Sequence, residues 1–394
     1  MIVKYMSWVV AAWVATQKKM RVFACSVSPV ANQDVPKAAL AVENGNVELW
    51  DIGLQSSKRH LSRVRTARHG SEETLRTAWS NDGSVIISGG SDGLLKLWDG
   101  ELGFRSEIAL EVKEPEDQAV YATWFRKGDR EVCVAYDDLV CGYDAESRTR
   151  IWKHKFDRAE QLVTPRNVLG KRLVFDAHEQ AGNSGLVSAA LSDGSFTLVD
   201  SKSNSLVRRI DAHSAATTSC RFSTNSVVTA SVDGTACVWD MRTWKKTFVT
   251  PSLKTIVYGA HFIKEESVVL AWARNALLWW DVSNSQQGQM MELEFPVICV
   301  DQGHGILLAC GELEEESETC RHGHSHAPDP HGTGHSHGVA EGSCHHHGHS
   351  HSIPASHDCN GKDDNSASAN HDERKRTKQD VKGLLAIPLT NLLN

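Results

Sequence analysis

The sequence predicts an all-β protein built from a repeated unit of four short strands. Pairs of a large side chain and an aspartate recur along the 394 residues at intervals of 40 to 56, ending at Asp51, Asp99, Asp144, Asp200, Asp240 and Asp281. Most pairs close an apolar, β-branched run that follows a tight turn, often Asp-Gly, which is the pattern of a β-hairpin. A period in the forties with short strands indicates a ring of small sheets.

The expected strands follow one another in order along the chain. Each unit contributes three strands before its closing aspartate, and an outer strand such as 104–110 or 245–250 follows. The runs are 22–28, 38–44 and 46–51; 75–80, 84–90 and 94–99; 120–125, 131–137 and 139–144; 172–178, 186–191 and 195–200; 218–223 with the hairpin 227–242; and 257–262, 267–272 and 276–281. These six units account for the chain as far as Asp281.

The seventh unit is interrupted. Residues 296–300 and 305–311 have the pattern of its first two strands, a polar insert follows at 312–381, and 383–389 resumes as the third strand. We expect the apolar run 7–15 to supply the missing fourth strand, so that the N-terminal strand closes the ring and removes a sheet edge. Residues 6–15 also have the length of a signal-peptide core, and a start at Met20 would omit them.

Two copies of the repeat are especially regular, GGSDGLLKLWD at 89–99 and ASVDGTACVWD at 230–240. With the repeat period, they resemble the WD-repeat β-propeller family, and the resemblance covers nearly the whole chain outside the insert. It implies a seven-bladed β-propeller formed by residues 1–311 and 382–394. The composition of residues 312–381 predicts a disordered insert in the last blade.

The resemblance also implies a buried hydrogen-bond chain in the two regular repeats, from a histidine to an aspartate, then a hydroxyl, then a tryptophan indole. The matching residues are His69, Asp92, Ser88 and Trp98 in one repeat, and His213, Asp233, Thr229 and Trp239 in the other. Ser, His and Asp together also fit a hydrolase, and residues 89–93 match G-x-S-x-G. A strand is expected after that motif where a nucleophile elbow needs a helix, so we interpret both features as structural and expect no enzyme. The other five blades are expected to rely on apolar packing.

The stretch 227–242 ends in Trp239, Asp240 and Arg242. It resembles the DWD box of substrate receptors for cullin-RING ubiquitin ligases. That resemblance implies that these three residues face the ligase adaptor, with Arg242 on the turn after the third strand and the insert on the opposite face. The alternatives are a turn arginine that pairs with a nearby carboxylate, and a scaffold that serves a different multiprotein complex.

The insert concentrates metal-binding side chains. Of the chain's 20 histidines, 13 lie between His322 and His371. Imidazole and thiolate groups bind Zn(II), Cu(II) and Ni(II). The candidate ligands are His322, His324, His326, His335, His337, Cys344, His345, His346, His347, His349 and His351. Metal binding or sensing is therefore the second functional hypothesis, although a surface loop also tolerates a long hydrophilic insertion at little entropic cost. No cofactor is required by the propeller itself.

Composition narrows the partners and the compartment. The net charge of -7 argues against a dedicated nucleic-acid binder, and the apolar N-terminal run is too short to cross a bilayer. The ten cysteines contain no CxxC pair, which fits free thiols in the cytoplasm or nucleus. A basic cluster at 373–378 is a candidate nuclear-import signal. Other proteins are the expected partners.

Overall fold

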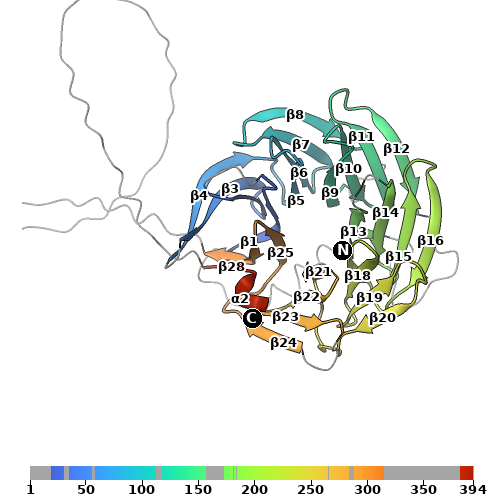
Figure 1. The fold of residues 1–394 in the computed structure, drawn as a ribbon. Coiled ribbons are helices and arrows are strands. Elements are labelled where there is room, and N and C mark those ends of the chain that lie inside the picture. Colours follow the sequence, from blue (N-terminus) through green and yellow to red (C-terminus); the bar gives the residue numbers. More distant parts are fainter. Residues whose placement is uncertain are drawn as a thin grey trace, which may run out of the picture. The chain divides into compact units, whose positions relative to one another are not determined.

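The computed structural model describes residues 19–30, 35–55, 58–111, 118–156, 173–180, 182, 184–264, 266–283, 288–314 and 382–393. The chain divides into two units, Met1–Glu315 with Lys378–Asn394, and Glu316–Thr377. In the described part of the first unit, seven antiparallel sheets succeed one another in chain order around a common centre (Figure 1). The expected seven-bladed β-propeller is confirmed.

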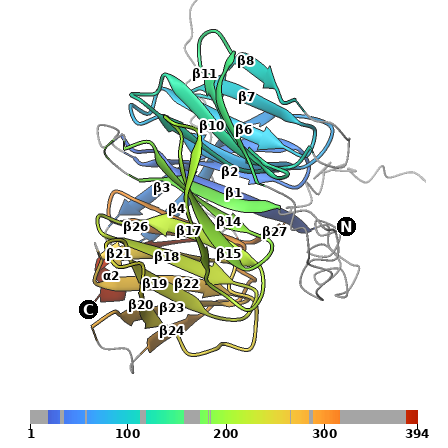
Figure 2. The same cartoon turned by 90° about the vertical axis from the view of Figure 1, so that its right-hand side faces the viewer.

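The strands follow the repeat closely. Blade one contains β1 (Lys19–Val27), β2 (Lys37–Val42), β3 (Asn46–Gln55) and β4 (Lys58–Arg68), and blade two contains β5 (Thr74–Trp79), β6 (Val85–Gly90), β7 (Leu94–Asp99) and β8 (Phe104–Ala109). Blade three contains β9 (Val120–Arg126), β10 (Glu131–Tyr136), β11 (Leu139–Asp144) and β12 (Arg150–Lys155), and blade four contains β13 (Val174–Glu179), β14 (Leu186–Leu191), β15 (Ser195–Asp200) and β16 (Ser205–Asp211). Figure 2 shows these sheets from the side.

The remaining blades complete the ring. Blade five contains β17 (Thr217–Phe222), β18 (Ser226–Ser231), β19 (Ala236–Asp240) and β20 (Lys246–Val249), and blade six contains β21 (Gly259–Lys264), β22 (Val268–Ala273), β23 (Ala276–Asp281) and β24 (Gly288–Glu292). Blade seven has three described strands, β25 (Cys299–Gly303), β26 (Ile306–Cys310) and β28 (Leu384–Pro388). A short β27 (Glu312–Glu314) and the four-residue helix α2 (Thr390–Leu393) are the other elements.

Burial along each blade explains the strand patterns. The second strands are almost wholly buried, as in β6 and β14, because neighbouring blades cover both of their faces. Outer strands such as β16 are mostly exposed. Seven apolar clusters hold the blades together, one at each junction between neighbours in the described chain. Packing against both neighbours therefore stabilises each blade, as in other repeat architectures.

Glycine shapes the hairpins of the two regular repeats. Gly93 and Gly234 follow Asp92 and Asp233 in the turns after β6 and β18, and their φ angles are +73° and +85°. A side chain is strained in this left-handed region. At Gly234 an added Cβ would also lie 3.0 Å from a backbone oxygen of Thr255. The Asp-Gly turns that the sequence indicated are therefore required by backbone geometry.

The ring closes through the start of blade one. β28 pairs with β26, so residues 383–389 do resume as the third strand of the last blade. Residues 7–15, the expected fourth strand, lie outside the described residues. In the described chain, β27 pairs antiparallel with the start of β1, in the register Met20 opposite Leu313. Both side chains are buried, so the first three residues assigned to the polar insert belong to a strand that joins the last blade to the first.

Candidate functional site

The first predicted hydrogen-bond set comes together in blade two. The Trp98 indole N–H donates to Ser88 Oγ at 2.8 Å, and His69 Nδ1 lies 2.7 Å from the same oxygen. His69 Nε2 lies 3.3 Å from a carboxylate oxygen of Asp92. A neutral imidazole with its proton on Nε2 satisfies every partner, because it donates to Asp92 and accepts from the Ser88 hydroxyl.

The second set comes together in blade five, where the two imidazole nitrogens exchange partners relative to blade two. Trp239 donates to Thr229 Oγ1 at 3.0 Å, and His213 Nε2 lies 2.9 Å from that oxygen. His213 Nδ1 faces both Asp233, at 3.2 Å, and the Thr235 hydroxyl, at 3.2 Å. In both blades the histidine stands between the aspartate and the hydroxyl. The predicted order, with the aspartate between the histidine and the hydroxyl, is therefore wrong.

Hydrogen bonding keeps the two aspartates charged. Burial is the largest single influence and would raise the pKa of Asp92 and Asp233. The hydrogen bonds from His69 and His213, with backbone N–H groups, together outweigh burial and lower both pKa values. The Ser88 and Thr229 side chains are fully buried and their oxygens accept from an indole. Neither hydroxyl reaches solvent as a nucleophile would need to.

The other five blades were expected to rely on apolar packing, and blades one and three add buried charged groups to their apolar clusters. In blade one, Trp50 donates to Glu48 at 2.9 Å, and the other oxygen of Glu48 pairs with Arg63 at 3.0 Å. In blade three, Trp152 on β12 donates to Glu131. Both glutamates have 1% of their surface exposed. A charged residue in a strand that is otherwise apolar, as in NVELWD and EVCVAYD, is the signal that sequence reasoning passed over.

Arg242 lies on the exposed turn between β19 and β20. Its side chain is 81% exposed, and its guanidinium pairs with Asp240 at 3.3 Å. Asp240 also accepts from the Thr243 backbone N–H at 2.7 Å, whereas the Trp239 ring is buried. Of the three residues of the DWD resemblance, Arg242 therefore offers the free surface. The predicted metal ligands between His322 and His351 lie outside the described residues.

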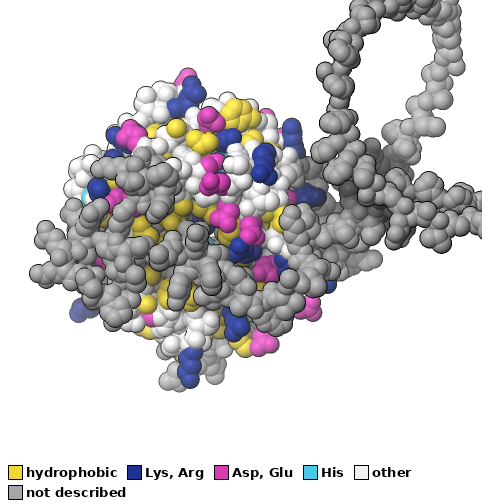
Figure 3. All heavy atoms as spheres, turned by 180° about the vertical axis from the view of Figure 1, so that it is seen from behind, with side chains coloured by type: hydrophobic (Ala, Val, Ile, Leu, Met, Phe, Trp, Pro, Cys, Tyr) yellow, Lys and Arg dark blue, Asp and Glu magenta, His cyan; other side chains and the backbone are white. Residues whose placement is uncertain are grey.

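A cavity of about 500 Å³ runs along the propeller axis. Each blade contributes its innermost strand to the wall, namely β1, β5, β9, β13, β17, β21 and β25. Partly buried aromatic side chains line it, namely Phe23, Trp124, Phe222 and Tyr258. Figure 3 shows the face opposite to that of Figure 1, where acidic, basic and hydrophobic side chains are interspersed. Sequence reasoning did not single out this cavity.

Charged groups of both signs lie in the cavity wall. Arg221 pairs with Asp176 at 3.0 Å, and Asp176 also accepts from the Cys220 backbone N–H at 3.2 Å. Arg76 donates to the backbone oxygens of Leu75 at 3.0 Å and Tyr121 at 2.5 Å. Burial lowers the pKa of Arg76, and the Asp176 carboxylate opposes that shift. Backbone carbonyls and an aspartate thus hold two guanidinium groups inside the ring.

Two histidines of the wall are neutral. Burial, reinforced by the charge of Arg221, lowers the pKa of His178 well below its ordinary value and that of His261 to about 3. His261 donates to the Val300 backbone oxygen at 3.2 Å, while His178 Nδ1 accepts from the Phe222 backbone N–H at 3.3 Å. The wall therefore presents aromatic side chains, neutral imidazoles and arginines that are held by hydrogen bonds and an ion pair.

Known proteins resemble parts of this chain. Residues 62–99 and 204–240 match the family of the WD domain, G-beta repeat. The chain is 28% identical over 136 residues to cell division cycle 20.4, cofactor of APC complex, from Arabidopsis thaliana, covering 33% of this chain and 28% of that protein. It is 27% identical over 176 residues to the peroxisomal targeting signal 2 receptor of Schizosaccharomyces pombe, covering 43% of this chain and 49% of that protein. The chain thus spans about a quarter to a half of these relatives.

The two matched segments end at Asp99 and Asp240. These residues close the third strands of blades two and five, the blades that hold the histidine networks. In the described part of the chain, no helix has the length and hydropathy of a membrane-crossing segment. The repeat matches, the relatives and the seven blades together show that the chain belongs to the WD-repeat family of β-propellers.

Proposed function

We propose that this protein is a non-enzymatic adaptor that binds other proteins within a multiprotein complex of the cytoplasm or nucleus. The observation that carries the proposal is the axial cavity, whose wall contains Trp124, Phe222 and Tyr258 together with the fixed guanidinium of Arg221. Aromatic side chains and arginine dominate the energetic centres of protein interfaces. The names of the relatives, a cofactor of a complex and a receptor for a targeting signal, describe proteins that act with other proteins.

Two further observations support this proposal. The serine and threonine of the histidine networks are buried and bonded, so a hydrolase reading of those sets has no accessible nucleophile. All seven cysteines in the described ranges are free thiols, which suits a reducing compartment. Microscopy of the tagged full-length chain tests the compartment, and a secreted product would contradict this part of the proposal.

The adaptor function is tested by truncating the cavity aromatics. In affinity capture with quantitative mass spectrometry, the variant Phe222→Ala/Tyr258→Ala is compared with the native chain. Specific partners are expected to fall by about tenfold or more, because removing central aromatic anchors costs about 2 kcal/mol each. Phe104→Ala is the matched control, since Phe104 is 58% exposed on the outer strand β8.

Thermal denaturation must first show that the double variant is folded. A captured partner must then bind the purified native chain directly in calorimetry. If a folded cavity variant retains every partner of the native chain, the cavity is not the binding site.

A finer proposal is that the protein is a substrate receptor of a cullin-RING ubiquitin ligase. It is supported by the exposed guanidinium of Arg242 directly after Trp239 and Asp240. Arg242→Ala should abolish co-purification of the ligase adaptor and leave cavity-dependent partners bound. Arg148→Ala, an exposed arginine on the equivalent turn of blade three, should change neither. An adaptor absent from the native capture, or retained by Arg242→Ala, contradicts this proposal.

The alternative function is metal binding or sensing through the insert. It is supported by the 13 histidines between His322 and His371. Deleting residues 320–359 should alter the tolerance of cells to Zn(II), Ni(II) or Cu(II) while the propeller keeps its melting temperature. Unchanged tolerance would remove metal handling by the insert from the functions of this protein.

A further inference from the structure

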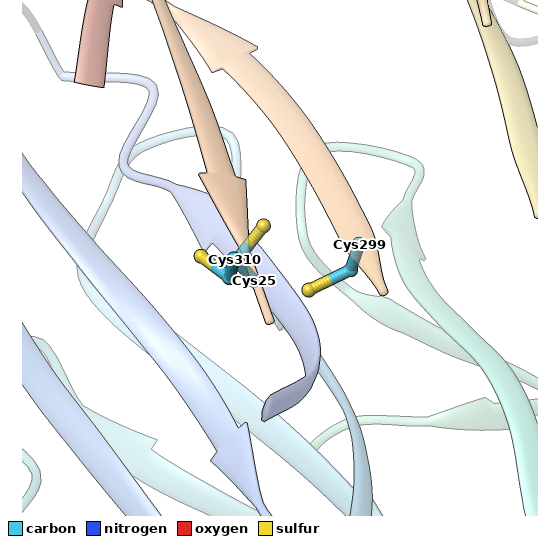
Figure 4. A group of neighbouring side chains, drawn as sticks. All are labelled: Cys25, Cys299 and Cys310. Carbon is cyan, nitrogen blue, oxygen red and sulfur yellow. The ribbon is translucent and has the colours of Figure 1, made fainter. Parts of the chain in front are cut away.

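Three cysteines meet where the last blade contacts the first. Cys25 comes from β1, Cys299 from β25 and Cys310 from β26. Their sulfur atoms all lie within 4.8 Å of one another. Figure 4 shows the three side chains near one another on these strands, with Cys299 directed towards the other two. We call this group the seam cysteines.

The backbone fixes the positions of these side chains. Cys299 and Cys310 are direct partners in the β25–β26 ladder, where opposite side chains stand about 5 Å apart. Cys25 reaches them from the neighbouring sheet, and its thiol lies 3.9 Å from the Leu308 backbone oxygen. The surroundings are the apolar cluster of the closing junction, which includes Val22 and Leu308. Three sulfur atoms are thus pre-arranged in apolar surroundings.

We infer that the seam cysteines form a three-thiolate site for Cu(I). Soft thiolate ligands favour Cu(I) and Zn(II) among the common metals. Structural Zn(II) sites almost always have four protein ligands. Among the described residues, no fourth Cys, His, Asp or Glu joins this group. A soft ion of low coordination number therefore fits the three sulfurs better than Zn(II) does.

The site has an entry path and a compensating charge. Cys25 and Cys299 also line the axial cavity, so an ion can reach the sulfurs from solvent. Arg76 lies in the same wall, and its guanidinium offsets part of the negative charge that thiolates bring. Each thiol that binds the ion as a thiolate releases its proton to solvent.

The test is a competition titration of the reduced, full-length chain under anaerobic conditions. Cu(I) is supplied as its coloured bicinchoninate complex, and the loss of colour reports transfer to the protein. The native chain should take up one more Cu(I) ion than Cys299→Ser. Cys237→Ser, which alters a buried cysteine of blade five outside the group, should match the native chain. Ligands of the insert are present in all three proteins and cancel in the difference.

A second measurement uses the native chain alone, so it does not depend on the folding of a variant. Alkylation with N-ethylmaleimide, mapped by mass spectrometry, should be slower at Cys299 after one equivalent of Cu(I) is added. A parallel titration with Zn(II) should leave Cys299 reactive. Equal Cu(I) uptake by native and Cys299→Ser, unchanged alkylation of Cys299, or protection by Zn(II) instead of Cu(I) would each overturn the inference.

Discussion

Blades two and three each contain a buried tryptophan indole, and they provide its hydrogen-bond acceptor in different ways. In blade two, the Trp98 indole donates to the Ser88 hydroxyl. His69 bonds to that hydroxyl, and Asp92 bonds to the other nitrogen of His69. In blade three, the indole of Trp152 donates straight to the carboxylate of Glu131. A buried indole N–H needs an acceptor. The two indoles lie on different strands, Trp98 on the third strand β7 and Trp152 on the outer strand β12, and each finds a buried acceptor on the second strand of its blade.

The two networks differ in how many buried charged groups they contain. The blade-two network contains one carboxylate at its rim. In blade three, Glu131 is buried with Arg126 at 3.2 Å and Lys127 at 2.8 Å, and Arg126 also pairs with Glu179 at 3.2 Å. Buried charges are costly unless every partner is present. The ionic cluster should therefore be more sensitive to loss of one member than the histidine network.

The largest effect is expected from Glu131→Ala. This change leaves Trp152 without its acceptor and removes a carboxylate from Arg126, whose side chain is 2% exposed. Breaking such a buried pair costs about 3–5 kcal/mol, to be read from urea denaturation. Glu101→Ala is the control, because Glu101 is 60% exposed in its pair with Lys37 and should cost less than about 1 kcal/mol. Similar losses for the two variants would contradict the comparison.

A smaller loss is expected from Thr229→Val in blade five. Valine keeps the shape of threonine but removes the hydroxyl that accepts from Trp239 and faces His213. Leaving buried partners unsatisfied costs about 1–3 kcal/mol, measured again by the urea midpoint. Thr229→Ser keeps the hydroxyl and should recover most of the lost free energy of unfolding. If serine is no better than valine, packing and not hydrogen bonding sets the stability of this blade.

The smallest effect is a change in acid sensitivity. Because the pKa of Asp233 is lowered in the folded chain, its contribution to stability is complete above the unfolded pKa of about 3.9. That contribution is lost as pH falls from there towards the folded value. Asp233→Asn should therefore show a shallower loss of melting temperature than the native chain below about pH 4.

Asp211→Asn is the matched control for this acid series. The Asp211 side chain is 86% exposed, so its replacement should leave the native slope unchanged. If the melting temperature of Asp233→Asn falls with pH as steeply as that of the native chain, the charge of Asp233 does not contribute to the stability of the network.

The repeat made the fold predictable because its signals come from residues that lie close together in sequence. Apolar alternation, Asp-Gly turns and a period in the forties all depend on residues near one another in sequence, and the observed strands agree with them. The histidine sets came from the family resemblance, which could be applied residue by residue because Ser88, Asp92 and Trp98 lie within one hairpin. Their connection was less predictable, because the position of the imidazole depends on how a loop from the preceding blade meets that hairpin.

The axial cavity and the seam cysteines were not predictable in this way. Arg76, Asp176 and Arg221 come from three different blades, and Cys25 is 285 residues from Cys310 in sequence. Only ring closure brings such residues together. A charged residue in the middle of an inner strand, as in LRTAW or VFDAH, is the local sign that the strand faces a cavity and not a sealed core.

The two ends of the insert meet at a single backbone bridge. The Gly311 N–H donates to the Gly383 oxygen at 2.9 Å, and the Gly311 oxygen accepts from Val22 at 2.9 Å. Gly383 has a φ of +95°, and an added Cβ would lie 2.0 Å from a backbone oxygen of Glu312. These hydrogen bonds hold the chain before and after the insert side by side at the closing junction. This position is consequently suited to domain insertion. We expect that a foreign domain with adjacent termini can replace residues 316–377 while the seven blades keep their structure.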